Sequence, residues 1–301
     1  MTSPRVLVAG GTGRLGTLLV TGLVARGVDV RVLTRDRQRA AHLVDVEIAL
    51  GDVRDPVSTA AAATDADVVV SAVHGFAGPG GGSPESVDRD GNTQLFRAAH
   101  ATGAAVVLMS VVGAAPDSPF ELFRMKYAAE TALAAGGTPA TVVRATAFLE
   151  LWIELLTSTA GRGNRPVVFG RGQNPVNLVS VRDVAALVTR VVLDPTTRGD
   201  TLEIGGPQNL TLTELARMVA AHNGAPNEPR HAPRPALRVM AATLGRLRPE
   251  LGRQARAALA MDHEDMTYDV ATHDARTRFP DLPLTAAAQV LHELGTARRP
   301  T

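Results

Sequence analysis

The chain has 301 residues, a formal net charge of +1 and 45% hydrophobic residues, which is typical of a globular protein with a large core. The near-zero charge gives no field that would attract nucleic acid or a membrane surface, and the absence of cysteine excludes disulfides, thiol catalysis and thiolate zinc sites. No apolar stretch approaches the roughly 20 residues of a membrane span, and Met-Thr-Ser-Pro-Arg leads directly into a strand. We therefore expect a cytoplasmic protein without metal, membrane or nucleic-acid partners.

The first predicted strand runs into a glycine-rich turn and an amphipathic helix, in the sequence Val6-Leu-Val-Ala-Gly-Gly-Thr-Gly-Arg-Leu-Gly16. Gly10, Gly13 and Gly16 stand three residues apart, and Gly11-x-Gly13-x-x-Gly16 matches the other form of the dinucleotide fingerprint. Such a turn lets the backbone approach a pyrophosphate, which the free N–H groups at the start of the helix then face. A loop that needs glycine only for positive φ is the alternative, but the strand before it and the helix after it favour nucleotide binding.

The second predicted strand, Val28–Leu33, ends at Thr34-Arg35-Asp36. In βαβ units an acidic residue at this tip favours the ribose 2′-hydroxyl of NAD, whereas arginine favours the 2′-phosphate of NADP. Arg35 therefore indicates NADP, and Arg14 in the glycine turn could reach the same phosphate. The alternative is that Arg35 is a solvated charge paired with Asp36.

Two further strands are predicted over Val46–Leu50 and Asp67–Ser71. After the first of them, Asp52 and Val53 could flank an adenine ring or form a simple turn. After the second comes the glycine-rich loop Ala72–Ser83, placed where parallel strands open toward ligand, so a mobile lid is plausible. His74 in this loop is either a candidate acid or a solvent-exposed residue.

Strand and helix patterns keep alternating through the middle of the chain. We predict a helix that Asp90-Gly91-Asn92 either starts or interrupts and that runs to about Ala101, and a second helix over Phe120–Ala135. Strands are predicted over Ala105–Ser110 and Ala140–Arg144. This alternation predicts an α/β protein with a doubly wound parallel sheet of the Rossmann type.

The pattern changes after Ala147. It indicates a helix over Phe148–Thr157, a glycine-rich turn near 161–163, and strands near 167–169 and 176–179. A helix over 181–193 follows, then a strand over 201–204 that is expected to rejoin the main sheet, and a helix capped by Thr211 with Glu214. The Pro-, Arg- and Ala-rich stretch 226–259 is predicted to form helices of a smaller lobe. We therefore predict an NADP-binding domain over 1–147 with a return segment at about 178–206, and a mainly helical substrate lobe over 148–301.

Several motifs, in order, resemble the short-chain dehydrogenase/reductase superfamily, and most closely its atypical NmrA-like or isoflavone-reductase-like branch. They are the glycine turn, Thr34-Arg35, Gly51-Asp52, the helix at Asp90-Gly-Asn92, Ser110, Lys126, Val143-Arg-Ala-Thr-Ala-Phe148 and Val179-Ser-Val-Arg-Asp-Val184. The resemblance covers roughly residues 5–206. It implies cofactor contacts from Gly10, Thr12, Gly13, Arg14, Leu15, Gly16, Arg35, Asp52, Val53, Ala72, Val73 and Lys126.

The resemblance also implies a catalytic serine, a tyrosine proton donor four residues before a lysine, and that lysine on the nicotinamide ribose. Ser110 and Lys126 match, but Leu122 stands in the tyrosine position, and Tyr127 follows the lysine on another side of the helix. Lys126 is the sole lysine of the chain, either by chance or because the site needs a titratable ammonium. By analogy with isoflavone-reductase-like proteins, Lys126 could act as the acid or base.

The sequence thus predicts an NADPH-dependent oxidoreductase for a small apolar carbonyl, enone or quinone-like substrate, with Lys126, Ser110 and His74 as the catalytic candidates. Phe148 and Trp152 are the candidate substrate contacts, although an aromatic pair at helical spacing more often packs in a core. One alternative is a redox sensor that binds NADP without turnover, and another is a non-redox isomerase or cyclase on the same scaffold. A homodimer is compatible with all three.

Overall fold

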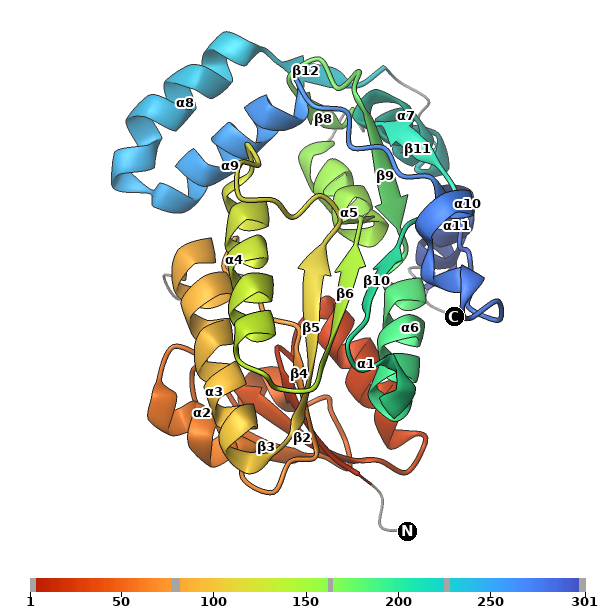
Figure 1. Ribbon diagram of the computed structural model, residues 1–301. Coiled ribbons are helices and arrows are strands. Elements are labelled where there is room, and N and C mark those ends of the chain that lie inside the picture. Colours follow the sequence, from red (N-terminus) through yellow and green to blue (C-terminus); the bar gives the residue numbers. More distant parts are fainter. Residues whose placement is uncertain (1–3, 77–81, 162–164, 225–227, 298–301) are drawn as a thin grey trace. The chain divides into compact units, whose positions relative to one another are not determined.

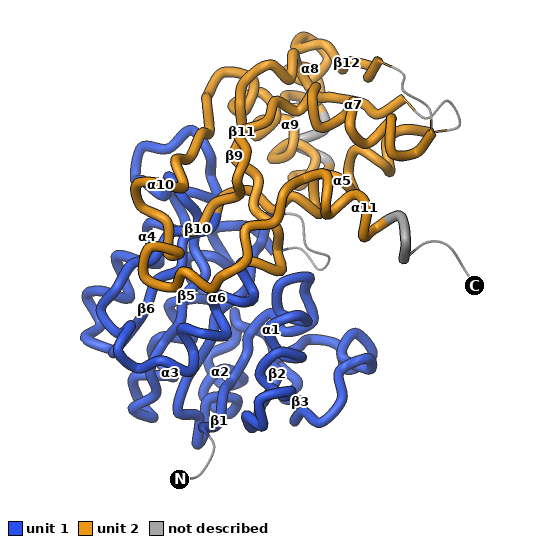
Figure 2. The backbone as a smooth tube through the Cα atoms, turned by 90° about the vertical axis from the view of Figure 1, so that its right-hand side faces the viewer, with its two compact units in different colours: residues 1–145, 184–203 blue, residues 146–183, 204–301 orange. Residues whose placement is uncertain are grey.

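The computed structural model describes residues 4–76, 82–161, 165–224 and 228–297. The chain divides into two compact units, residues 1–145 with 184–203 and residues 146–183 with 204–301 (Figure 2). The centre of the predicted lid and most of the turn at 161–163 lie outside the described residues.

The first unit is built on a seven-stranded sheet with the order β10-β6-β5-β4-β1-β2-β3 among the described residues (Figure 1). Neighbouring strands from β1 to β6 pair in parallel. This order is that of a dinucleotide-binding fold, and β1 and β4 lie side by side at its centre. The strands are β1 (Arg5–Ala9), β2 (Asp29–Thr34), β3 (Glu47–Leu50), β4 (Val68–Ser71), β5 (Ala105–Val111), β6 (Ala140–Ala145) and β10 (Thr201–Ile204).

Helices cover both faces of this sheet. In Figure 1, α2, α3 and α4 lie on one side and α1 and α6 on the other, so the predicted doubly wound α/β fold is confirmed. Asp55 caps α2 by accepting hydrogen bonds from the N–H groups of Val57 and Ser58. The segments are α1 (Arg14–Val24), η1 (Gln38–Ala40), α2 (Pro56–Ala63), α3 (Asn92–Thr102), α4 (Glu121–Ala135), α6 (Val181–Leu193) and η3 (Pro195–Thr197).

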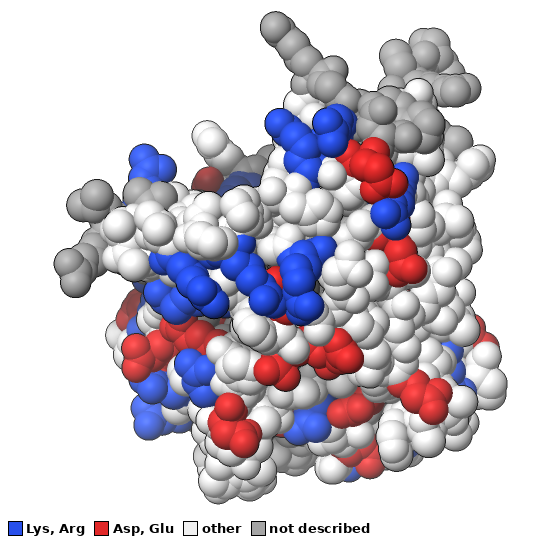
Figure 3. Space-filling model, turned by 90° about the horizontal axis from the view of Figure 1, so that it is seen from above, with Lys and Arg blue, Asp and Glu red and all other residues white. Residues whose placement is uncertain are grey.

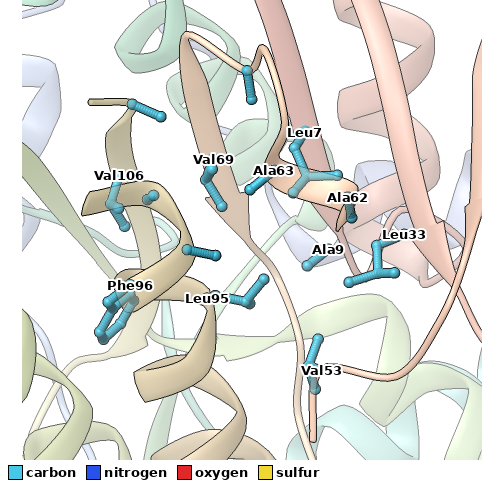
Figure 4. Packing of buried hydrophobic residues seen from close by; sticks show 14 of the residues in the cluster. Leu7, Ala9, Leu33, Val53, Ala62, Ala63, Val69, Leu95, Phe96 and Val106 are labelled. Atoms are coloured by element: carbon cyan, nitrogen blue, oxygen red, sulfur yellow. The ribbon is translucent and has the colours of Figure 1, made fainter. Parts of the chain in front are cut away.

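A core of buried apolar side chains joins the sheet to α2 and α3 (Figure 4). Leu7 and Val69 from the central strands meet Leu95 and Phe96 from α3 in this cluster. Burying each large side chain stabilises the fold by about 1.5–3 kcal/mol, so the carboxyl ends of β1 and β4 are held on a rigid base.

The helix predicted around Asp90-Gly91-Asn92 is a regular α-helix only from Asn92 onward. Residues Pro84–Gly91 form a π-helical segment, η2, that continues directly into α3. Ser83 caps it in a capping box with Ser86. The wide turn of a π-helix is not encoded in the 3.6-residue period, which explains why the sequence pattern did not show it.

The second unit contains two small sheets, ordered β11-β9-β7 and β12-β8, and several helices. The capping box of Thr211 with Glu214 is confirmed, as is helix in the Arg- and Ala-rich stretch. Its elements are β7 (Ala147–Phe148), α5 (Leu149–Thr159), β8 (Val167–Phe169), β9 (Pro175–Val179), β11 (Asn209–Thr211), α7 (Leu212–His222), β12 (Arg230–Ala232), α8 (Arg234–Leu247), α9 (Pro249–Met261), α10 (Val270–His273), η4 (Ala275–Thr277) and α11 (Ala287–Ala297).

A buried polar network stabilises the second unit at its carboxyl-terminal end. Asp183 accepts hydrogen bonds from the hydroxyl and the N–H of Thr285, at 2.6 and 2.8 Å, and pairs with Arg276 at 3.2 Å. Burial raises the pKa of Asp183, and these hydrogen bonds and the guanidinium oppose that shift. All charges of the network are paired, so we assign it to the scaffold.

Candidate cofactor and active site

The turn between β1 and α1 has no room for side chains at two of its glycines. A Cβ on Gly10, whose φ is +88°, would lie 2.5 Å from the carbonyl oxygen of Ala72, and one on Gly16 would lie 2.1 Å from that of Gly10. The N–H of Gly13 closes the turn by donating to the same Gly10 oxygen at 3.0 Å. The turn therefore packs closely against the segment after β4, with no space for a side chain between them.

The start of α1 offers positive potential to an anion. Gly13 is extended at the N-cap, no side chain caps the helix, and its first turn holds no acidic residue. The first N–H groups of such a helix bind phosphate. Thr12 is partly buried and Arg14 exposed, whereas Leu15 points into the core and can offer only its backbone.

The tip of β2 carries an exposed arginine near a carboxylate. Thr34 is buried and its hydroxyl donates to the carbonyl of Asp36, while Arg35 is exposed. Asp52 is held by Arg54 at 2.6 Å. Arg54 lowers the pKa of Asp52 most, and Arg35 adds to that effect, so Arg35 lies within electrostatic reach of Asp52. This places the two predicted contacts for the adenosine end at one edge of the sheet.

Val53 contributes mainly to the core. It is 9% exposed and belongs to the cluster between the sheet and α3, where a Cβ on Gly91 would lie 2.8 Å from one of its methyl groups. A contact between Val53 and an adenine ring stays a prediction.

The segment after β4 lies directly against the glycine turn. The N–H of Ala72 donates to the carbonyl of Ala9 at 2.9 Å, and the carbonyl of Val73 accepts from Nζ of Lys126 at 3.0 Å. Lys126 is 4% exposed and pairs with Asp88 at 3.0 Å. The sole lysine thus reaches the backbone of the segment that lies against the glycine turn, and its contact with a cofactor stays a prediction.

His74 follows this lysine-bound carbonyl, and its side chain is exposed. The surrounding protein lowers the pKa of His74 by desolvation; the carboxylate of Asp88 opposes this shift and the ammonium of Lys126 adds to it. The charges of both Asp88 and Lys126 therefore act on the imidazole of His74.

Ser110 lies in a different polar cluster, which we call the Glu130 cluster. Its members are Ser110 on β5, Glu130 on α4, Arg144 on β6 and Glu203 on β10. The Ser110 hydroxyl donates to Glu130, whose carboxylate also pairs with Arg144 at 2.6 Å. Ser110 is 3% exposed, so its hydroxyl serves a structural contact in this conformation.

Leu122 and Tyr127 lie on α4 on either side of Lys126 in sequence, and both are partly buried. Tyr127 comes one residue after Lys126, which places it about 100° further round the helix. The tyrosine position of the family motif is therefore filled by a side chain without a proton to donate.

The predicted substrate contacts belong to the second unit. Phe148 is the N-cap residue of α5, and Trp152 packs against a core cluster that includes Leu156 and Leu215. Both aromatic residues are partly buried. Their contact with a substrate stays a prediction.

No other feature of the described residues suggests a different kind of site. Across residues 4–76, 82–161, 165–224 and 228–297, no group of three or more His, Asp or Glu side chains could hold a metal ion. Within the same ranges, no helix is both long and apolar enough to cross a membrane. On the face shown in Figure 3, basic side chains lie among acidic ones.

Comparison with known proteins agrees with this geometry. Residues 10–195 match the family model described as NAD(P)H-binding. The chain belongs to this NAD(P)H-binding family. The predicted NAD(P)H-binding family is confirmed, and an isoflavone reductase is among the solved structures that share the fold.

Three proteins similar to this chain have named activities. The NAD(P)H azoreductase of Xenophilus azovorans is 28% identical over 227 residues, which cover 73% of this chain and 74% of that protein. The NADPH-dependent quinone oxidoreductase of Escherichia coli, solved with NADPH, has a TM-score of 0.76 at 19% identity, covering 96% of this chain and 99% of that one. An isoflavone reductase structure has a TM-score of 0.70 at 19% identity, covering 97% and 100%.

Two carboxylates that hold predicted site residues in place in this NAD(P)H-binding protein were not predicted from the sequence. Asp88 and Glu130 are carboxylates on predicted or neighbouring helices, each bonded to a residue that we had singled out. Glu130 stands four residues after Lys126, a spacing that puts both on one face of α4. That spacing was the available signal for Glu130, whereas Asp88 lies in the π-helical segment, where helical spacing gives none.

Proposed function

We propose that the protein is an NADPH-dependent oxidoreductase that reduces a small apolar carbonyl, enone or quinone-like molecule without a tyrosine proton donor. The observation that carries this proposal is the contact between the glycine cradle and the segment after β4, whose Val73 carbonyl binds Lys126. It brings a pyrophosphate site and a buried ammonium to the same edge of the central strands.

Each end of the cradle suits one part of the cofactor. The backbone of the glycine turn, with Thr12, would hold the pyrophosphate, and Asp52 and Val53 would lie at the adenine. Ala72, Val73 and Lys126 would face the nicotinamide ribose, where the ammonium can donate to hydroxyl groups. When bound, the reduced nicotinamide supplies the hydride.

The missing tyrosine favours quinone-like acceptors within this substrate class. Hydride addition to a simple ketone leaves an alkoxide, which must take a proton from a strong nearby donor. Addition to a quinone leaves a phenolate, whose charge the ring already stabilises. A site with Leu122 in the donor position therefore suits the second reaction better, and the names of the azoreductase and quinone oxidoreductase agree with easily reduced acceptors.

Arg35 and Arg14 are proposed to select NADPH over NADH by binding the 2′-phosphate. Arg35→Asp replaces the guanidinium by a carboxylate that repels this phosphate, and we expect the ratio of NADPH to NADH affinity to fall about 10- to 100-fold, or about 1.4–2.7 kcal/mol. Arg37→Asp is the matched control, because Arg37 is also exposed but lies two residues beyond the strand tip. An unchanged ratio in Arg35→Asp would remove the assignment.

Two measurements test the proposed function. Calorimetric titration with NADPH and with NADH comes first, and we expect selective binding of NADPH. Cofactor oxidation is then followed with a quinone, an enone and a simple ketone, and we expect the quinone to react fastest. Binding without any turnover would favour the redox sensor, and conversion of a substrate without net loss of NADPH would favour an isomerase or cyclase.

A further inference from the structure

Lys126 and Asp88 form a buried ion pair in the first unit. Nζ of Lys126 lies 3.0 Å from Oδ1 of Asp88, and the two side chains are 5% and 0% exposed. A charge in the interior is costly unless it is paired and hydrogen bonded, so each member depends on the other to stay ionised there.

The pair holds the backbone on both sides of His74. On the preceding side, Nζ of Lys126 donates to the carbonyl of Val73 at 3.0 Å. On the following side, the N–H of Gly75 donates to Oδ2 of Asp88 at 2.7 Å. The backbone on each side of this one imidazole is therefore fixed by one member of the same ion pair.

Asp88 is itself fixed to the end of β4. The side-chain amide of Asn92 donates to the Asp88 carbonyl at 2.7 Å, and the Ser71 hydroxyl donates to the Asn92 side-chain oxygen at 2.5 Å. Both contacts are buried. The π-helical segment that carries Asp88 is thus tied to the strand from which the His74 segment emerges.

His74 has the exposure and charge environment of a proton carrier. His74 is exposed, although the protein around its imidazole removes part of its hydration, whereas the ammonium of Lys126 is enclosed. The surrounding protein lowers the pKa of His74, Asp88 opposes this shift and Lys126 adds to it, so the imidazole is affected by both charges of the pair.

We propose that Asp88 and Lys126 are positioning residues for His74, and that the His74 imidazolium gives substrate the proton that Leu122 cannot supply. This inference rests on the proposed function. The hydride adds to a carbon of a carbonyl or enone, or to one oxygen of a quinone, and the π bond that breaks leaves its electron pair on the substrate oxygen that becomes an alkoxide, enolate or phenolate. That oxygen then takes the proton from an imidazole N–H, and the exposed, neutral imidazole regains a proton from water.

The contacts of Lys126 argue against the lysine as the proton source. Its ammonium donates to Val73 and pairs with Asp88, and loss of a proton would leave the buried carboxylate without its counter-charge. The lysine therefore keeps its charge through the reaction, holds the backbone and remains able to donate to the ribose. The exchangeable proton therefore belongs to the neighbouring imidazole of His74, which is exposed.

The positioning role is tested first in the protein without cofactor. The eight histidines are titrated by NMR, with the His74 signal assigned from His74→Gln and the exposed His100 as internal reference. We expect His74 to titrate below the ordinary value of about 6.5. Lys126→Met removes a nearby positive charge and releases the segment after β4 to water. Both effects should raise the pKa of His74, while the signal of His100 stays unchanged.

Asp88→Asn keeps an oxygen that can accept from Gly75 but removes the charge. It serves as the second variant if Lys126→Met does not fold. We expect its His74 pKa to differ from that of the wild type, while the signal of His100 again stays unchanged. A His74 titration that is the same in wild type and in both variants would overturn the positioning role, whether or not the protein turns over any substrate.

The proton transfer is tested by the pH dependence of kcat with a carbonyl or enone acceptor. We expect kcat to fall as pH rises through the His74 pKa found by NMR, because the imidazolium is then lost. His74→Gln should lower kcat about 100-fold or more and remove this dependence, with NADPH affinity unchanged, and His100→Gln should match wild type. A dependence that survives in His74→Gln but disappears in Lys126→Met would assign the proton to the lysine instead.

Discussion

The glycine turn after β1 and the segment after β4 touch each other but are built by opposite means. The turn depends on missing side chains, since a Cβ on Gly10 would collide with Ala72. The segment depends on added charges, since Lys126 and Asp88 hold it from both sides. One half of the candidate site is therefore fixed by sterics and local sequence, and the other by an ion pair between distant residues.

The largest effect is expected where this ion pair is broken. Lys126→Met leaves the fully buried Asp88 carboxylate uncompensated, and we expect the free energy of unfolding to fall by about 3–5 kcal/mol, measured by urea denaturation. Adding Asp88→Asn to this variant removes the orphan charge, so part of the loss should be recovered.

The control is an ion pair of the same unit that water reaches. Arg5 and Asp29 pair at 2.7 Å with side chains 35% and 45% exposed, so Arg5→Met should cost far less stability than Lys126→Met. Equal losses of unfolding free energy in Lys126→Met and Arg5→Met would mean that the segment after β4 does not depend on its buried charges.

The steric half of the comparison is tested at Gly16. Its Cβ would lie 2.1 Å from the Gly10 carbonyl oxygen, so Gly16→Ala must displace backbone and should cost about 1–3 kcal/mol, together with most of the NADPH affinity. Thermal unfolding and calorimetry measure the two effects.

Gly13→Ala is the matched control for this crowding. Its Cβ would come no closer than 3.2 Å to the same oxygen, and its φ of −83° suits any residue. We expect a smaller loss of stability than in Gly16→Ala. If both variants unfold alike, the turn is sensitive to flexibility rather than to space.

This contrast also explains what the sequence revealed. The alternation of strands and helices, the glycine turn and Arg35 at the tip of β2 were predictable because their signals lie within a few neighbouring residues. Lys126 stood out as the only lysine. Asp88 did not, because it meets Lys126 across 38 positions from within a π-helical segment, and no pattern in one sequence records such a pairing.

The Glu130 cluster lies one turn along α4 from Lys126, outside both of these regions. If the chemistry depends on charges held beside the glycine turn, this cluster is structural, although it contains the predicted catalytic residue Ser110. The hydroxyl of Ser110 is committed to Glu130, and Arg144 still satisfies that carboxylate when the hydroxyl is removed.

Among Lys126→Met, Gly16→Ala and Ser110→Ala, the last should therefore have the smallest effect. We expect a loss of about 1 kcal/mol in stability, the usual net value of one hydrogen bond, and a fall in kcat of less than about 10-fold. Glu130→Gln is the companion variant, because it weakens the pairing with Arg144 and should cost more stability than Ser110→Ala. A fall of 100-fold or more in kcat for Ser110→Ala, with stability unchanged, would instead place its hydroxyl on the substrate, which requires it to leave Glu130 when the cofactor binds.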